Sequence, residues 1–565
     1  MLFWSLLTPP KGAALMLFLV LPLIVMGLII SLFSSSTLLI EWEFASVSDM
    51  VLFVPLLFDK YSLVFGLTVA LISFSVMIFS ISYMSGDFSL EYFIYMVMLF
   101  VLSMNMLIFI PNLIILLLGW DGLGLTSYLL VIYYQSDSSL SAGMVTAITN
   151  RIGDALLILS GSWMLLSGNW NLFIMNNSVI WMVGLVIMVA AMTKSAQIPF
   201  SAWLPAAMAA PTPVSSLVHS STLVTAGVYL LFRFYESLSM FNYFNNFIFY
   251  SGVMTCLMAG LSAIFENDLK KVIALSTLSQ LGVMMMALGL SQPLLAFFHL
   301  VTHAMFKALL FICAGNIIHC KQNNQDLRLM GNIWSSMPVT CTAMNVANVA
   351  LCGLPFMAGF YSKDMIVETF MFTNHPISTG FMLMLSVILT SFYSIRLSFY
   401  TLWSPMKSQS SSVLNDESIC IYVPCLVLLS GAITSGAVMM WAVVPSLNIM
   451  SLPLLMKIMA LSLIVFLGFC SYSIVSSNKI LPGGHFCSSM WFLSYLTSSP
   501  LVGNSMKVSK MFSVNELTWL EMLSGKATMS VIKKLSLNFQ IAQGFSFSQL
   551  FSLISCVLIL GLVIF

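Results

Sequence analysis

Residues 179–208 read VIWMVGLVIMVAAMTKSAQIPFSAWLPAAM. This run is apolar and long enough to cross a hydrocarbon core of about 30 Å, yet it contains Lys194 and then Pro199 and Pro205. Proline removes an amide donor and breaks a helix. A broken helix is tolerated inside a membrane only where it is buried in protein or lines a wet cavity. The stretch therefore predicts a membrane helix that is interrupted for a functional reason.

A second stretch, residues 336–371, has the same character. It contains Gly353, Pro355 and Gly359, which are followed by Lys363 and Asp364. Because glycine lets the backbone leave helical geometry, this run also predicts a broken helix. Two such helices in corresponding positions of two halves are the best pointer in a sequence to a transport site. We place the halves at about 96–236 and 237–404, each with about five segments.

The rest of the chain is equally apolar. It has 565 residues, of which 60% are hydrophobic and 7% charged, and a mean hydropathy of +1.02. Apolar runs of about 20 residues recur along its whole length without a period of two, which predicts helices rather than a barrel. We expect an all-α polytopic membrane protein with about fifteen spans. Residues 1–95 form its N-terminal helices, residues 405–565 form its C-terminal helices, and 404–417 form a Ser-rich polar loop.

Composition excludes several kinds of function. The net charge is +1 and only four arginines occur, too few for a nucleic-acid surface. The ten cysteines form no CxxC pair or iron–sulfur pattern, and the chain has no Walker-type loop, HExxH or GxGxxG motif. His299 and His303 lack a Cys or carboxylate on the same run to complete a metal site. We expect no cofactor and no metal bound by this chain.

The few charges are placed inside apolar runs. The ionisable residues there are Asp121, Asp154, Lys194, His219, His299, His303, Lys307 and Lys363. Each charged one costs at least about 2.5–3.5 kcal/mol at the centre of a span, so pairing, hydration or neutralisation must remove most of that cost. Buried ionisable residues of this kind mark ion and proton pathways by default, although inert structural pairs are an alternative.

Spacing strengthens this interpretation for one run. His299, His303 and Lys307 follow an i, i+4, i+8 pattern, so they share one helix face. Histidine titrates near neutral pH, and a lysine beside a movable carboxylate can load and release a proton. The three residues therefore indicate a proton relay, and Asp121 and Asp154 are the natural partners for Lys194.

Several ordered motifs in residues 90–400 carry a family resemblance. They include GWDGLG at 119–124, NRIGD at 150–154, KSAQ at 194–197, PTPVS at 211–215, HSST at 219–222, QLG at 280–282, HAMFKA at 303–308 and GFYSKD at 359–364. Together they resemble the chain 5 family of NADH–ubiquinone oxidoreductase, the distal antiporter-like subunits of respiratory complex I. The Met-rich, Arg-poor composition is similar to that of mitochondrially encoded members.

The resemblance implies a proton-translocating subunit with two inverted five-helix repeats, each holding a broken helix. The key acid of the family falls on Asp121, its first lysine on Lys194 and its connecting histidine on His219. The axis continues through His303 and Lys307 to a terminal lysine at Lys363, beside Asp364. NAD, FMN, iron–sulfur clusters and ubiquinone would be bound elsewhere in the complex.

The resemblance also implies a location and partners. We expect the mitochondrial inner membrane, other membrane-arm and accessory subunits, lipids such as cardiolipin, and no nucleic acid. Two departures from the family stand out. Its usual glutamate is Asp121 here, one methylene shorter, and the N-terminal region is about one span shorter than in many relatives.

Residues 505–545 predict a different element. Apolar residues recur there at spacings of three and four, but the stretch carries too many lysines and glutamates for a span. Ser513 with Glu516 has the form of a capping box, and Gly525 is a weak point. We expect an amphipathic lateral helix lying along the membrane as a brace, anchored by a final span at 548–565, or alternatively a helix folded back on this chain.

Two other functions compete with a proton channel of a redox pump. One is a subunit of a multisubunit cation/proton antiporter, which shares the same core motifs. The other is a scaffold whose buried charges are inert pairs.

Overall fold

The computed structural model describes residues 8–34, 36–47, 50–164, 180–241, 243–373, 376–405, 407, 416, 418–443, 453–476, 484–523, 525–544 and 546–564. The chain forms two compact units, Met1–Phe492 and Leu493–Phe565. Most of the predicted polar loop at 404–417 lies outside the described residues. The boundaries predicted at 96, 237 and 405 fall inside the first unit and stay predictions.

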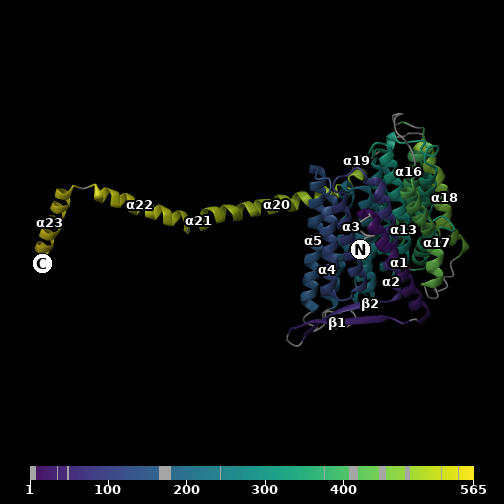
Figure 1. Cartoon of the computed structure of the whole chain (residues 1–565), viewed down its shortest axis with the longest axis horizontal. Helices are drawn as coiled ribbons and strands as arrows, with labels where there is room; N and C mark the ends of the chain where they lie inside the picture. Colours follow the sequence, from purple (N-terminus) through teal and green to yellow (C-terminus); the bar gives the residue numbers. More distant parts are fainter. Residues whose placement is uncertain are drawn as a thin grey trace. The chain divides into compact units, whose positions relative to one another are not determined.

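The first unit opens with a helix, a hairpin and a second helix. Their bounds are α1 Pro9–Ser34, β1 Leu38–Val47, β2 Met50–Phe58 and α2 Lys60–Tyr83. The strands pair antiparallel from Leu38↔Phe58 to Val47↔Met50, and the hairpin lies across one end of the helices (Figure 1). The Nδ2 atom of Asn112 ties it there by donating to the carbonyl of Phe53 at 3.0 Å. The predicted helical membrane fold is confirmed, and this one hairpin is an addition that the sequence prediction did not contain.

Five consecutive segments follow, and the fourth is broken. They are α3 Leu90–Phe109, α4 Leu113–Val131, α5 Asp137–Met164, α6 Ile180–Lys194 with the short α7 Trp203–Ala206 and η3 Ala207–Ala209, and α8 Thr212–Val214 with η4 Ser215–Thr222 and α9 Leu223–Arg233. The predicted break after Lys194 is confirmed, because α6 ends at that residue.

A second set repeats this order. After α10 Tyr235–Leu238 come α11 Phe244–Phe265, α12 Leu269–Gly289, α13 Pro293–Cys320 with η5 Leu327–Leu329, α14 Pro338–Cys352 and α15 Ala358–Phe372, and α16 Ile377–Ser398 with η6 Phe399–Trp403. The fourth segment is again broken, between α14 and α15, so the second predicted break is confirmed. Gly353 lies at the break with φ +80°, in the left-handed region that favours glycine.

The unit ends with α17 Ile419–Ala442, α18 Leu454–Ser476 and α19 Gly484–Ser488. Within the part of the chain that the structure describes, 12 helices are long and apolar enough to cross a membrane, or up to 13 if one bent pair is a single span. The broken segments are too short to be counted on this basis, which explains most of the difference from about fifteen predicted spans. The core lies among α9, α12 and α13, whose spans are the most completely buried.

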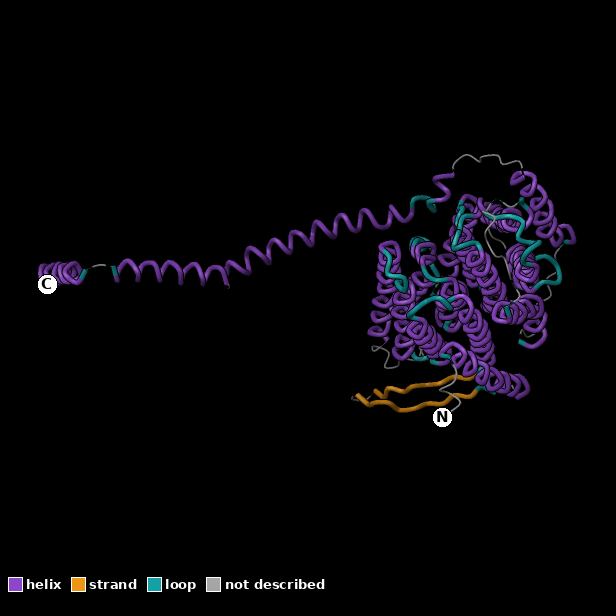
Figure 2. The backbone as a smooth tube through the Cα atoms, turned by 45° about the horizontal axis from the view of Figure 1, so that its top comes forward, coloured by secondary structure: helices purple, strands orange, loops and turns teal. Residues whose placement is uncertain are grey.

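The second unit is helical. It contains α20 Leu493–Asn515, η7 Glu516–Leu520, α21 Glu521–Leu523, α22 Gly525–Gln543 and α23 Phe547–Ile564. Helices α20 to α22 follow one another as a long element (Figure 2), and α23 turns from α22 by 100°. The helical prediction for 505–545 is confirmed. Its capping box is wrong, because Ser513 lies inside α20 and its hydroxyl donates to the carbonyl of Lys510.

Candidate functional site

Lys194 occupies the end of the first broken helix. It is the last residue of α6, and the chain leaves helical geometry at Ala196, where φ is +52°. Its side chain is completely buried. The Nζ atom donates to the carbonyl of Trp120 and lies 4.0 Å from the centroid of the Trp120 ring. The amine is therefore held by a neutral carbonyl and an aromatic face rather than by a direct carboxylate contact.

The carboxylates expected to pair with Lys194 are bridged by an arginine instead. An Arg151 nitrogen lies 2.6 Å from Asp121 on α4 and 3.2 Å from Asp154, one turn further along α5. Because a guanidinium offers several donors in a fixed fork, it can serve both acids at once. Among the described residues neither acid forms a direct ion pair with Lys194, so both act on its amine only through space. A contact between Asp121 and Lys194 through one water, which the shorter aspartate favours, stays a prediction.

His219 lies in a π-helical segment. Both of its ring nitrogens are buried without a hydrogen-bond partner, and its ring centroid is 6.4 Å from that of Trp203. The Trp203 indole donates to the carbonyl of Thr193, next to Lys194, at 2.9 Å. This segment, η4, packs against α9 and α13. It therefore lies between the Lys194 region and the helix that carries the next ionisable residues.

Local sequence explains this wide turn. The hydroxyls of Ser221 and Thr222 donate to the carbonyl of Leu217 at 3.0 and 2.7 Å. Side-chain donors of this kind satisfy carbonyls that a regular helix would bond to amides. π-Helical turns are frequent at functional sites. The sequence prediction does not single out this turn, although its serines and threonine are a usable signal.

Helix α13 carries the predicted relay, and its members are completely buried. Lys307 donates to the hydroxyl of Ser276 on α12 at 2.6 Å. His299 bonds the hydroxyl of Ser362 on α15 through Nδ1 at 2.8 Å and Oε1 of Gln280 through Nε2 at 3.2 Å. His303 lies between them, 6.2 Å from the His299 ring centroid, and neither of its ring nitrogens has a partner.

Lys363 continues the line on the second broken helix. It is buried, and its Nζ atom donates to the hydroxyl of Thr390 on α16 at 2.8 Å and to the carbonyl of Leu351 at 3.5 Å. Its neighbour in sequence is Ser362, the partner of His299. Gly359 lets α15 begin close to α14, because a Cβ there would stand 1.9 Å from the carbonyl oxygen of Ala350. The break thus brings Lys363 beside α13.

Asp364 faces another direction. It is half-buried, and the charges that act on it are those of Glu368 and Lys457. The structure therefore brings together the lysines and histidines of the predicted site but leaves Asp364 outside that line.

Several polar partners were missed by the sequence interpretation. They are Arg151, Ser276, Gln280, Ser362 and Thr390. Arg151 had a signal in its i, i+3 spacing to Asp154. The hydroxyl and amide residues gave none, because such side chains usually bond their own helix.

A further buried pair has no place in this line. Arg233, at the end of α9, lies 2.6 Å from Asp59, which caps α2 and is also bonded to the amide of Ser62. Both side chains are about nine-tenths buried. The pair joins α9 to α2 next to the hairpin, which is the arrangement expected of an ion pair that stabilises the fold.

The chemistry of the line follows from what surrounds its lysines. Among the ion pairs of the described residues, none includes Lys194, Lys307 or Lys363. Each amine instead donates to a neutral oxygen. Neutral acceptors stabilise the charged form less than a carboxylate does, so these amines are suited to exchanging protons.

Three family profiles cover most of the chain. Residues 42–94 match the N-terminal region of NADH-ubiquinone oxidoreductase (complex I) chain 5. Residues 110–392 match the membrane domain of NADH:quinone oxidoreductases and Mrp antiporters, and residues 393–565 match the C-terminal region of NADH dehydrogenase subunit 5.

Individual relatives agree with these profiles. The chain is 47% identical to NADH-ubiquinone oxidoreductase chain 5 of Lumbricus terrestris and 46% identical to that of Anopheles gambiae, with 89% of each chain covered in both comparisons. Among solved structures it is similar to a Mrp complex chain from Dietzia, at TM-score 0.73 and 22% identity, over 91% of this chain and 60% of that one. It is also similar to a chain of an archaeal membrane-bound sulfane sulfur reductase, at TM-score 0.69 and 18% identity, over 94% and 95%.

Proposed function

Because the chain belongs to the chain 5 family of NADH–ubiquinone oxidoreductase, we propose that its buried lysines and histidines form the path along which it moves protons. The chain is a proton-translocating, multi-pass subunit of the membrane arm of complex I, and other membrane-arm subunits are its partners. The residue roles and the coupling to electron transfer are the proposed part.

The single observation that supports the path is the placement of Lys194, Lys307 and Lys363. All three are buried among the helices, and each donates to a neutral oxygen. A permanently charged amine in such surroundings would be costly, whereas an amine that alternates between charged and neutral forms is suited to them. A scaffold would be served better by close ion pairs such as Arg233–Asp59.

In the first half, the arginine bridge sets the charge beside Lys194. When Arg151 holds Asp121 and Asp154, as here, the acids stabilise the ammonium of Lys194 only at a distance. Release of an acid from Arg151 toward Lys194 would favour proton uptake by the amine, and its return would favour loss of that proton. The proton would pass towards His219 along the side of Trp203, with water bridging the unpartnered imidazole.

In the second half, one proton moves between adjacent bases. The Lys307 ammonium gives its proton to neutral His303, leaving a neutral amine and an imidazolium. The His303 imidazolium then passes a proton to neutral His299, which passes one on through water to the neutral amine of Lys363, so that both histidines are neutral again. Each donor loses one proton in its transfer, and it is protonated again when the next proton arrives. Water is required beside His303, because neither of its nitrogens has a protein partner.

The surroundings of this subunit are inferred from the family. Electron transfer through NAD, FMN, iron–sulfur clusters and ubiquinone would take place elsewhere in the complex and drive the path from a distance. The mitochondrial inner membrane, accessory subunits and lipids such as cardiolipin complete the expected environment. The helices α20 to α22 would act as the lateral brace, with α23 as its anchor.

An antiporter subunit is the competing function, and the fold similarity to a Mrp complex chain is what favours it. At 22% identity that similarity shows the fold alone. The two functions predict different partner proteins. A complex I subunit copurifies with an NADH-oxidising arm, whereas an antiporter subunit does not.

A high-resolution density map of the intact complex tests the proposed path. We expect ordered waters linking His219 to Lys307, and His303 to Lys307 and Lys363. A dry, apolar gap between His219 and Lys307 would contradict a continuous path if more than about two waters were needed to bridge it.

A further inference from the structure

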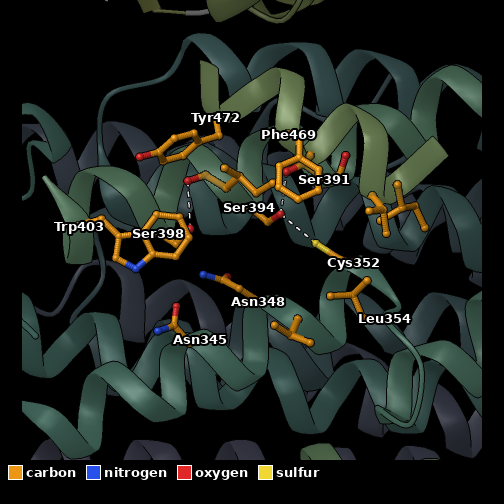
Figure 3. Close-up of a pocket in the computed structure, with 15 residues that line it drawn as sticks. Asn345, Asn348, Cys352, Leu354, Ser391, Ser394, Ser398, Trp403, Phe469 and Tyr472 are labelled. Atoms are coloured by element: carbon orange, nitrogen blue, oxygen red, sulfur yellow. Dashed lines mark hydrogen bonds between the residues drawn. The ribbon is translucent and has the colours of Figure 1, made fainter. Parts of the chain in front are cut away.

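A cavity of about 550 Å³ lies between α14, α16 and α18 and is open on one side, where Phe469 is 74% exposed (Figure 3). Its lining includes Asn348 and Cys352 from α14, Ser394 from α16, and Trp403, Phe469 and Tyr472. Cys352 bonds Ser394 at 2.9 Å. No residue of the proposed proton path lines the cavity.

The cavity is long and narrow. Figure 3 shows Trp403 and Tyr472 toward one end and Cys352 and Leu354 toward the other. Its α16 side runs from Ser391 to Trp403, which spans roughly 18 Å at 1.5 Å per helical residue. A volume of about 550 Å³ is enough to hold one hydrocarbon chain.

Among the polar groups of the lining, three serine hydroxyls are satisfied and one buried amide nitrogen is not. The hydroxyls of Ser391, Ser394 and Ser398 donate to carbonyls of their own helix. Asn348 is 6% exposed, and its Nδ2 atom has no hydrogen-bond partner. In Figure 3 its amide points into the cavity. A buried amide donor of this kind needs an acceptor from whatever fills the space.

The walls argue against a filling of water alone. Leu354, Ile464, Val465 and Phe469 make most of the cavity apolar, and apolar cavities stay dry. Both α16 and α18 are candidate membrane spans, so bilayer lipid is the occupant available at this depth. Tryptophan and tyrosine favour the membrane–water interface, which places the end with Trp403 and Tyr472 toward a headgroup.

We propose that this cavity binds one acyl chain of a membrane phospholipid. The ester carbonyl accepts a hydrogen bond from Nδ2 of Asn348, and the chain extends past Val465 and Phe469 to Cys352 and Leu354. The headgroup lies outside, beside Trp403 and Tyr472.

Photo-crosslinking in the purified intact complex tests this site. The probe is a phosphatidylcholine with a diazirine in one acyl chain, and labelled peptides of this subunit are identified by mass spectrometry. We expect labels on residues 345–354 and 464–472. Val465→Trp places an indole in the cavity and should lower this labelling at least about fivefold, since overfilling a packed space excludes a ligand.

Phe466→Trp is the matched control. Phe466 is the next residue on α18, is 65% exposed and does not line the cavity, so labelling should stay at the wild-type level. Asn348→Leu supplies an independent variant, because it keeps the volume and removes the donor. We expect it to lower labelling by the ester probe about three- to tenfold, in line with the loss of one hydrogen bond, and to leave labelling by a diazirine alkane unchanged.

Two results would overturn the site. One is labelling of these peptides that Val465→Trp and Asn348→Leu both leave unchanged. The other is labelling confined to outward residues such as Phe466. If Val465→Trp prevents assembly, the site is tested by Asn348→Leu alone. Labelling of this variant by the ester probe and by the diazirine alkane is then compared.

Discussion

The Nζ atom of Lys307 donates a 2.6 Å hydrogen bond to the hydroxyl of Ser276, and both residues are buried between α13 and α12. No ion pair of the described residues includes this lysine. A lysine whose direct contact is a hydroxyl keeps the freedom to lose its proton, which an ion-paired lysine lacks.

Lys307→Arg should abolish most proton translocation while the complex still assembles. Arginine keeps the positive charge but is not deprotonated in proteins, so it cannot act as a carrier. Proton uptake by vesicles during NADH oxidation measures the effect. Ser276→Ala is the control: it removes one hydrogen bond, worth about 1 kcal/mol, and should slow transport only a few-fold. Normal pumping by the arginine variant would exclude Lys307 as a carrier.

His303→Leu should leave the subunit as stable as wild type or more stable, yet reduce proton translocation strongly. The wild-type imidazole is buried with two unpartnered nitrogens, a cost of about 1–3 kcal/mol that an apolar side chain avoids. Heating the purified complex and following release of this subunit measures stability, and vesicle acidification measures transport.

His299→Leu is the contrasting variant for His303. It removes two hydrogen bonds and leaves Oε1 of Gln280 without its histidine partner, so it should destabilise the subunit by about 1–3 kcal/mol. Equal loss of stability in both histidine variants would argue against the unpartnered state of His303.

Arg151→Gln should impair pumping more than Arg151→Lys. Loss of the guanidinium frees both Asp121 and Asp154 from the bridge, so Lys194 would remain charged for longer and release its proton slowly. Lysine retains a positive charge beside both acids and should keep much of the activity. Identical pumping by the two variants would mean that the charge at 151 does not control Lys194.

Arg233 and Asp59 should behave as a structural pair. Arg233→Met strands a buried carboxylate and should destabilise the subunit by about 3–5 kcal/mol, whereas adding Asp59→Asn should recover much of that loss. Assembled Asp59→Asn/Arg233→Met complex should pump at the wild-type proton-to-electron ratio. A lowered ratio in that double variant would bring the pair into the proton path.

Some features of the fold and site could be predicted because they depend on local sequence. The breaks follow from Pro199 and Gly353, and the shared face of His299, His303 and Lys307 follows from spacing along one helix. The hairpin at 38–58 was missed, although Ile40 to Phe44 alternates apolar and acidic residues. The stretch lies between two apolar runs and is too short to stand out beside them.

The remaining features depend on tertiary packing. Nothing in the sequence near Asp121 indicates that Arg151, on the next helix, would take its carboxylate. Thr390 reaches Lys363 only because the break between α14 and α15 carries the lysine toward α16. Such partners are set by helix packing, which single-sequence patterns do not specify.

The central claim is that buried lysines carry protons, and the proton-to-electron ratio of Lys194→Ala complex tests it most directly. Lys271→Ala is the control, because Lys271 is more exposed and pairs with Asp268 at 2.8 Å. Proton uptake and NADH oxidation are measured together in vesicles, after assembly has been checked on a native gel. The proposed path predicts a lowered ratio for Lys194→Ala and a wild-type ratio for Lys271→Ala. A fully assembled Lys194→Ala complex that pumps at the wild-type ratio would contradict it.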